Sequence, residues 1–118
     1  MRYIGERYNG GLYMAESYAL TETTYYILLA LVQPRHGYGI MQVVEEYSQR
    51  RIRLAAGTLY GALNALVEKG WIVLLPPQEG SRRKEYRITE DGLMILQEEI
   101  ARLKELYENG EAILKGEK

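Results

Sequence analysis

Three consecutive cations, Arg82, Arg83 and Lys84, form the densest positive charge in the chain. They follow the loop-like residues 78–81 and precede residues 85–89, where polar and apolar side chains alternate as in a strand. This pattern predicts a hairpin with the cations at its tip. Cations at a loop tip can bind phosphate groups without being buried. Taken alone, such a run is as often a solvated loop, so the surrounding elements must decide between the two interpretations.

Composition favours one compact domain with an added arm or helix. The chain has 118 residues, of which 47% are hydrophobic, and it contains no cysteine, which excludes disulfides and thiolate metal sites. The net charge is −1, but residues 35–89 hold nine Lys or Arg against five Asp or Glu, whereas residues 90–118 hold four against eight. A basic middle and an acidic tail indicate a polyanionic partner more clearly than the total charge does.

Several function classes are not expected. The longest apolar run, residues 25–32, is too short to cross a bilayer, and the N-terminus lacks the pattern of a secretory signal. We therefore expect a cytoplasmic protein with no membrane partner and no cofactor. A catalytic or metal role for His36, the only histidine, would need partners that the sequence does not provide. A hydrogen bond at a helix entry is the expected role of His36, and Gly37 and Gly39 are expected to allow close packing of that helix start.

Two helices are predicted in the first half of the chain. The first follows Thr21, a suitable N-cap, and its apolar residues cover nearly every side, so it should be central and buried. Pro34 ends this stretch, because it disfavours helical geometry at the residue before it. The second helix occupies residues 37–50 and should bury one face made of Ile40, Val44 and Tyr47.

A third helix and a hairpin follow. Residues 58–69 place Leu59, Leu63 and Leu66 on one buried stripe, and Gly70 provides the stop. Residues 71–77 and 82–89 are predicted to be the two strands of the hairpin.

The last helix should start after Thr89 and fray or end at Asn109-Gly110. Its main apolar stripe advances in steps of three and four, which is the pattern of a helix that packs lengthwise on another helix. The three preceding helices and the hairpin already form a small domain with its own core, so we assign this stripe to a homodimer contact. The predicted dimerisation residues are Leu93, Leu96, Ile100, Leu103 and Tyr107.

These elements predict a mainly α fold with a small β-hairpin: a winged helix-turn-helix over residues 20–89 and a C-terminal dimerisation helix and tail over residues 90–118. The third helix would enter the major groove of double-stranded DNA, and the wing would contact phosphates or the minor groove. Residues 1–19 are expected to be an arm of uncertain role. An alternative hypothesis places the biological start at Met14.

Three motifs, "RHGYGIMQVVEE" at 35–46, "GTLYGALNALVEKGWI" at 57–72 and "SRRKEYRITEDG" at 81–92, resemble the PadR family of bacterial transcriptional regulators. The resemblance runs from about Leu20 to Leu106 and is closest to the short-tailed branch with a single terminal helix. It implies a homodimeric winged-helix repressor that binds a near-palindromic operator. In several members of the family a small molecule releases the DNA.

The resemblance also implies site residues. Tyr38 and Tyr60 match positions where the family uses tyrosine near the DNA backbone, although Tyr38 could equally pack beneath the first helix. The chain departs from the family pattern at Asn64 and Ala65, where basic residues are common, but Asn64 could still read adenine through a bidentate contact. It also departs at Ala55, where the family often has a polar cap, and this change costs about 1 kcal/mol of helix stability. The expected DNA-binding residues are Tyr38, Thr58, Tyr60, Gly61, Asn64, Arg82, Arg83 and Lys84.

Two other functions stay open at this level. A ligand-sensing protein could bind an apolar small molecule between subunits, in a pocket lined by Trp71, Met94 and Leu103. Trp71 is, however, more often a core anchor at such a helix-to-strand junction. A winged helix that binds only protein is conceivable because Asn64 and Ala65 carry no charge.

Overall fold

In the computed structural model, residues 19–116 are described. They divide into two compact units, one formed by Leu20–Gln97 and the other containing residues 98–116. The arm predicted for residues 1–19 lies, apart from Ala19, outside the described part of the chain, and so does Met14. Within residues 19–116, no helix is both long enough and apolar enough to span a membrane.

Helix α1 (Glu22–Ala30) is the central helix that the sequence predicted. The hydroxyl of Thr21 accepts a hydrogen bond of 3.1 Å from the backbone N–H of Thr24 and so caps the helix, as expected. Ile27 and Leu28 have no exposed surface, which confirms that apolar residues on several sides of one helix bury it in the core.

Helix α2 (Gly37–Tyr47) buries Ile40 and Val44, but the prediction for Tyr47 was wrong, because 63% of that side chain is exposed. Ser48 takes the buried position on this end of α2. Around the axis of a helix, a residue four positions after Val44 points more nearly the same way as Val44 than a residue three positions after it does, so Ser48 rather than Tyr47 faces the core. The Ser48 hydroxyl accepts from the N–H of Ile52 and donates to the carbonyl of Glu45, so its burial leaves no polar atom unsatisfied.

Helix α3 (Ala56–Lys69) buries Leu59, Leu63 and Leu66, which confirms the predicted stripe. Gly70 follows in the left-handed conformation with φ of 79°, where glycine avoids the steric penalty of a side chain. At the other end, Ala55 occupies the N-cap and supplies no side-chain hydrogen bond, as the sequence indicated.

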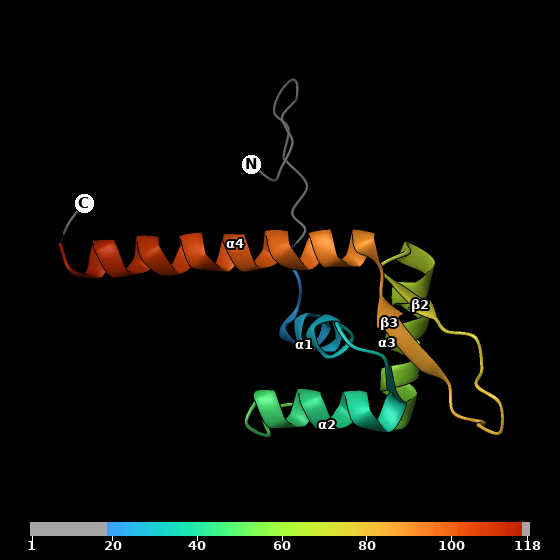
Figure 1. Cartoon of the computed structure of the whole chain (residues 1–118). Coiled ribbons are helices and arrows are strands. Elements are labelled where there is room, and N and C mark those ends of the chain that lie inside the picture. Colours follow the sequence, from blue (N-terminus) through green and yellow to red (C-terminus); the bar gives the residue numbers. More distant parts are fainter. Residues whose placement is uncertain (1–18, 117–118) are drawn as a thin grey trace. The chain divides into compact units, whose positions relative to one another are not determined.

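The hairpin is part of a three-stranded antiparallel sheet with the order β1-β3-β2. Strands β2 (Ile72–Leu74) and β3 (Glu85–Ile88) form the expected wing, which Figure 1 shows with its long loop, and both are shorter than predicted. Strand β1 (Arg35–His36) was not predicted, because two residues are too few to show alternation. It pairs with β3, so that His36 lies opposite Glu85 in the register.

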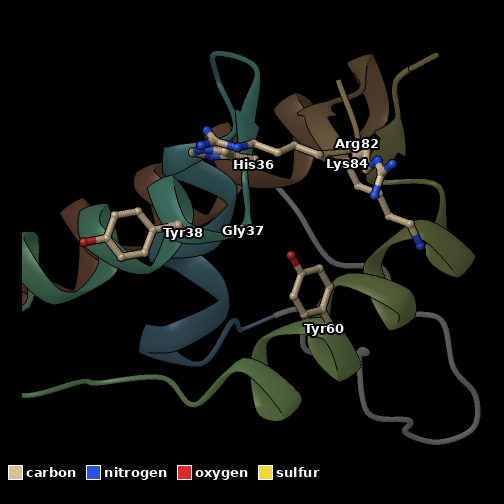
Figure 2. Close-up of a pocket in the computed structure, with 7 residues that line it drawn as sticks. His36, Gly37, Tyr38, Tyr60, Arg82 and Lys84 are labelled. Atoms are coloured by element: carbon tan, nitrogen blue, oxygen red, sulfur yellow. The ribbon is translucent and has the colours of Figure 1, made fainter. Parts of the chain in front are cut away.

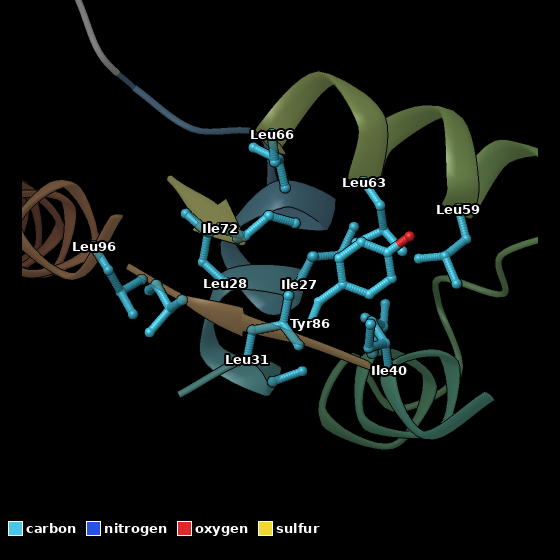
Figure 3. Close-up of a cluster of buried hydrophobic side chains, with 13 residues drawn as sticks. Ile27, Leu28, Leu31, Ile40, Leu59, Leu63, Leu66, Ile72, Tyr86 and Leu96 are labelled. Atoms are coloured by element: carbon cyan, nitrogen blue, oxygen red, sulfur yellow. The ribbon is translucent and has the colours of Figure 1, made fainter. Parts of the chain in front are cut away.

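The core of the first unit joins all three helices, the sheet and the start of the last helix. Tyr86 and Ile88 of β3 face the core while Arg87 between them is exposed, so the strand alternates as predicted. Figure 3 shows the aromatic ring of Tyr86 among these aliphatic side chains. The buried hydrophobic residues are Ile27, Leu28, Ala30, Leu31, Ile40, Val44, Leu59, Leu63, Leu66, Ile72, Tyr86, Ile88 and Leu96.

Helix α4 (Glu90–Leu114) begins directly after Thr89, as predicted. The Thr89 hydroxyl accepts from the N–H of Gly92 at 3.1 Å and donates to the carbonyl of Gly70 at 2.6 Å. The expected break at Asn109-Gly110 was wrong, since the helix continues through both residues. A single glycine inside a helix costs only about 1 kcal/mol, which is too little to end a helix that continues on both sides.

One predicted dimerisation residue needs correction. Leu96 is 2% exposed and belongs to the core of its own unit, so its burial requires no second chain. Leu93, in the same unit, is 37% exposed. In the second unit, the α4 residues with substantial exposed apolar surface include the predicted Ile100, Leu103 and Tyr107, together with Leu106, Ile113 and Leu114.

Candidate nucleic-acid interface

A shallow cavity of about 860 Å³ brings together residues from the start of α2, from α3 and from the loop of the wing. Figure 2 shows Tyr38 and Tyr60 projecting from their helices and Arg82 and Lys84 approaching from the wing loop. The two tyrosines and the three wing cations, far apart in the sequence, were all predicted to bind DNA. The cavity is lined by His36, Gly37, Tyr38, Tyr60, Arg82, Arg83 and Lys84.

The two tyrosines reach the cavity in different ways. Tyr38 lies in the first turn of α2. Because 66% of its side chain is exposed, it does not pack beneath α1, which was the alternative that the sequence left open. Tyr60 lies on α3 beside the buried Leu59 and is 39% exposed. A Cβ atom at Gly37 would overlap the Tyr60 hydroxyl oxygen and stand 2.9 Å from its Cζ. The absence of a side chain at Gly37 therefore allows α2 and the Tyr60 ring to approach each other.

The wing cations stand outside the strands. All three are exposed, and β3 begins only at Glu85. The loop is held locally by two hydrogen bonds: Ser81 N–H donates to the Gln78 carbonyl at 3.0 Å, and Arg83 N–H donates to the Ser81 hydroxyl at 3.2 Å. Within residues 19–116, no carboxylate forms an ion pair with these cations. Their positive charge is thus available to an anion from solvent.

His36 makes the predicted helix-entry bond and also lines the cavity, a role that the sequence did not indicate. Its Nδ1 accepts a hydrogen bond of 3.4 Å from the N–H of Gly39 and caps α2. The cavity position could not be read from the sequence, because it depends on the pairing of β1 with β3.

The other predicted DNA-binding residues lie on the exposed side of α3 and do not line the cavity. Thr58, Gly61 and Asn64 are exposed at intervals of three residues, away from the buried leucines. A Cβ atom at Gly61 would meet no atom within 4 Å, so packing does not require glycine there. These positions form a face of small and neutral side chains that could enter a groove.

A second cavity of about 660 Å³ shares Tyr38 and continues along α2. Its charges are largely compensated, because Glu45 lies 3.4 Å from the Arg53 guanidinium and 4.0 Å from that of Arg50. The lining residues are Tyr38, Met41, Gln42, Glu45, Glu46, Gln49 and Arg50. Paired charges of this kind attract an anion less strongly than the uncompensated wing does.

Neither of these two cavities contains the residues predicted to bind a small molecule, Trp71, Met94 and Leu103. Trp71 is half-buried and packs against the hydrophobic core, and the Lys69 ammonium lies 5.2 Å from its ring centroid. This supports the interpretation of Trp71 as a core anchor. Met94 is 55% and Leu103 is 38% exposed.

Helices α2 and α3, preceded by α1 and followed by the β2–β3 wing, define a winged helix-turn-helix, a class of DNA-binding domain. The model of the transcriptional regulator PadR-like family matches residues 27–98, which is more than half of the chain. The chain belongs to this family, and the protein is a DNA-binding transcriptional regulator. The family resemblance noted from the three motifs is therefore confirmed.

Solved structures agree with this assignment. A PadR-family transcriptional regulator from Eggerthella lenta shares 28% identity over 76% of this chain and 79% of its own, with a TM-score of 0.63. A PadR-like transcription factor from Bacteroides fragilis shares 29% identity over 78% and 87%, with a TM-score of 0.59. RosR from H. salinarum shares 26% identity over 82% and 92%, with a TM-score of 0.63. No curated protein matches the chain.

Proposed function

We propose that the protein is a homodimeric cytoplasmic repressor that binds a near-palindromic operator. The exposed face of α3 enters the major groove, and the wing cations bind phosphates or the adjacent minor groove. The observation that carries this proposal is the single cavity that Tyr38, Tyr60 and the three wing cations Arg82, Arg83 and Lys84 line together. Hydroxyl, guanidinium and ammonium groups are the donors that proteins use to hold the DNA backbone.

The exposed apolar residues of α4 support the homodimer. Ile100, Leu103 and Tyr107 follow the a/d spacing and are 45%, 38% and 67% exposed. A second copy of this helix would remove them from water, which is the main favourable term in such association. Two α3 helices in a dimer would then read half-sites about 34 Å apart, one turn of the duplex.

DNA upstream of the protein's own gene tests the operator. We expect an inverted repeat there that the purified protein retards more strongly than random duplex of equal length, with an affinity that falls steeply with salt. Replacing Arg82, Arg83 and Lys84 together by alanine should lower the slope of log affinity against log salt by about 0.9 for each phosphate that the variant no longer neutralises. Equal affinity for random duplex would contradict a specific repressor.

The dimer contact is tested by the variant Leu103→Glu, with Ala101→Glu as the control on a neighbouring exposed position of α4. Leu103→Glu should give single subunits in sedimentation at micromolar concentration, because a dimer would bury the new carboxylate. Ala101→Glu should remain dimeric. A single subunit for the unmodified protein would end the homodimer proposal.

One observation favours a second candidate, a winged helix that binds protein and holds DNA only weakly. Asn64 and Ala65 on the exposed face of α3 carry no positive charge. Charge reversal by Arg82→Glu and Arg83→Glu separates the two functions. The repressor proposal requires a large loss of DNA retention, whereas unchanged retention would favour the protein-binding module.

The family resemblance is the basis for proposing that a small molecule releases the DNA. A pocket between two subunits would take an apolar, aromatic compound. A thermal-shift screen with planar aromatic cations tests it: a rise in melting temperature that Met94→Ala abolishes would support an effector site, and no shift at any concentration would count against one.

A further inference from the structure

The backbone and the ring of His36 have different roles in the proposed DNA site. Its backbone belongs to β1 and pairs with Glu85 of β3, the first residue after the wing cations. Its ring caps α2 and also forms part of the cavity wall beside Tyr38 and Tyr60. The half-buried imidazole is therefore fixed between a helix start and the place where we put the DNA backbone.

The capping bond determines which ring nitrogen carries the proton. The Gly39 N–H donates to Nδ1 at 3.4 Å, so Nδ1 must offer its lone pair and cannot be protonated while the cap is intact. In a neutral imidazole the proton then lies on Nε2. Nε2 is on the far side of the ring from the capped backbone and is a donor that the cap does not use.

The surroundings of the ring favour an anion as the acceptor for this donor. Arg82, Arg83 and Lys84 line the same cavity as His36, and Tyr60 lies on its wall as well. The carboxylate nearest in the strand register, Glu85, is half-buried and is not among the lining residues. The cavity wall therefore offers mainly hydrogen-bond donors, and a phosphate oxygen is an acceptor that could bind to them.

We propose that His36 is a further phosphate contact: its Nε2–H donates a hydrogen bond to a DNA phosphate held by the wing cations, while its Nδ1 keeps α2 capped. This inference rests on the proposed function. It makes His36 a neutral donor, unlike the charged residues of the wing. A neutral donor contributes affinity without releasing a counterion, so it leaves the salt dependence of binding unchanged.

Two substitutions test the roles of the two ring nitrogens of His36 one at a time. His36→Asn retains an acceptor for the cap but has no group at the Nε2 position, because asparagine is shorter and is a good N-cap. His36→Gln places an amide N–H near the Nε2 position but is a poor cap. Thr21→Ala, which removes the cap of α1 far from the wing in sequence, controls for reduced stability alone.

Affinity would be measured by fluorescence anisotropy on a random-sequence duplex of about three turns, because phosphate contacts do not depend on sequence. We expect His36→Asn to bind about tenfold more weakly per subunit with an unchanged salt slope and unchanged melting temperature. His36→Gln and Thr21→Ala should melt at lower temperature but keep most of the affinity.

The outcomes distinguish this inference from the function on which it rests. Full affinity of His36→Asn, while the alanine triple variant of the wing binds more weakly, would overturn the role of His36 and leave the DNA site intact. A lower salt slope for His36→Asn would also overturn it, since the imidazole would then bind phosphate as a cation. If the wing variant binds as well as the unmodified protein, the proposed DNA site itself fails.

A measurement without DNA checks the tautomer. Long-range ¹H–¹⁵N correlation spectra of the full chain should show the Nε2–H form of His36, the only histidine. The Nδ1–H form would contradict the capping bond and with it the proposal.

Discussion

The Tyr60 ring on α3 lies against the backbone of Gly37 on α2, so closely that a methyl group at Gly37 would overlap the tyrosine hydroxyl. This contact joins the helix that is proposed to enter the groove to the helix whose first turn lines the cavity. It also explains why a glycine stands inside the first turn of α2, where alanine would be the better helix former.

Gly37→Ala should therefore destabilise the protein. The added methyl group must displace the Tyr60 ring or move the start of α2, and overpacking of this kind costs about 1–3 kcal/mol. Urea denaturation measures the decrease in stability. Because the hydroxyl oxygen is the nearest atom, the double variant Gly37→Ala with Tyr60→Phe should recover part of the stability. Unchanged stability of Gly37→Ala would mean that the close contact does not exist in solution.

Gly61→Ala should have the opposite effect on stability. A Cβ at Gly61 would meet no atom within 4 Å, so alanine gains about 0.5–1 kcal/mol from its better helix propensity. If the exposed face of α3 approaches DNA closely at this residue, the same methyl group should weaken binding. A variant that is both more stable and as tight on DNA would place Gly61 outside the interface. Denaturation and a binding titration on one preparation give both answers.

Ala55→Ser should stabilise α3 by supplying the N-cap that the chain lacks. Ala55 already has the extended backbone of an N-cap, with φ of −76° and ψ of 153°, but offers no side-chain acceptor. A serine hydroxyl there could accept from the N–H of Gly57 or Thr58, which is worth about 1 kcal/mol. The expected result is a rise in the midpoint of urea denaturation with an unchanged slope. No rise would show that water already satisfies these N–H groups equally well.

Tyr86 should make the stability fall at high pH. Burial, with a smaller contribution from nearby Tyr60, raises the pKa of the Tyr86 hydroxyl above its ordinary value of 10.0. Below about pH 10 the hydroxyl is protonated in both the folded and the unfolded chain, so it adds no pH dependence. Above that pH the unfolded chain loses this proton first, and stability declines until the pH passes the folded pKa.

Tyr86→Phe removes this titration. Its free energy of unfolding should fall less steeply above pH 10 than that of the unmodified protein, when both are measured by denaturant titration across the alkaline range. Equal slopes would show that the buried hydroxyl does not contribute. The comparison between the two chains is needed because the other tyrosines titrate in the same range in the unfolded state.

Local signals in the sequence were sufficient for most of the helices. Caps at Thr21 and Thr89, the stop at Gly70 and the leucine stripe of α3 all act within a few residues of one chain segment, so their physics can be read directly from the letters. Where the local signal was weak, the prediction failed. Asn109-Gly110 did not end α4, and Tyr47 is exposed because Ser48 fills the buried position.

The sequence by itself determined the class of the fold, the family and the charged tip of the wing, because periodicity, capping and motif spacing are local properties. The tertiary structure alone decided that β1 pairs with β3, that Leu96 belongs to the core, and that His36 and Gly37 join the tyrosines and the wing cations at one cavity. The residues involved lie far apart in the sequence, as do the strand partners Arg35 and Tyr86, which are 51 positions apart, and no local preference of either segment specifies such a pairing.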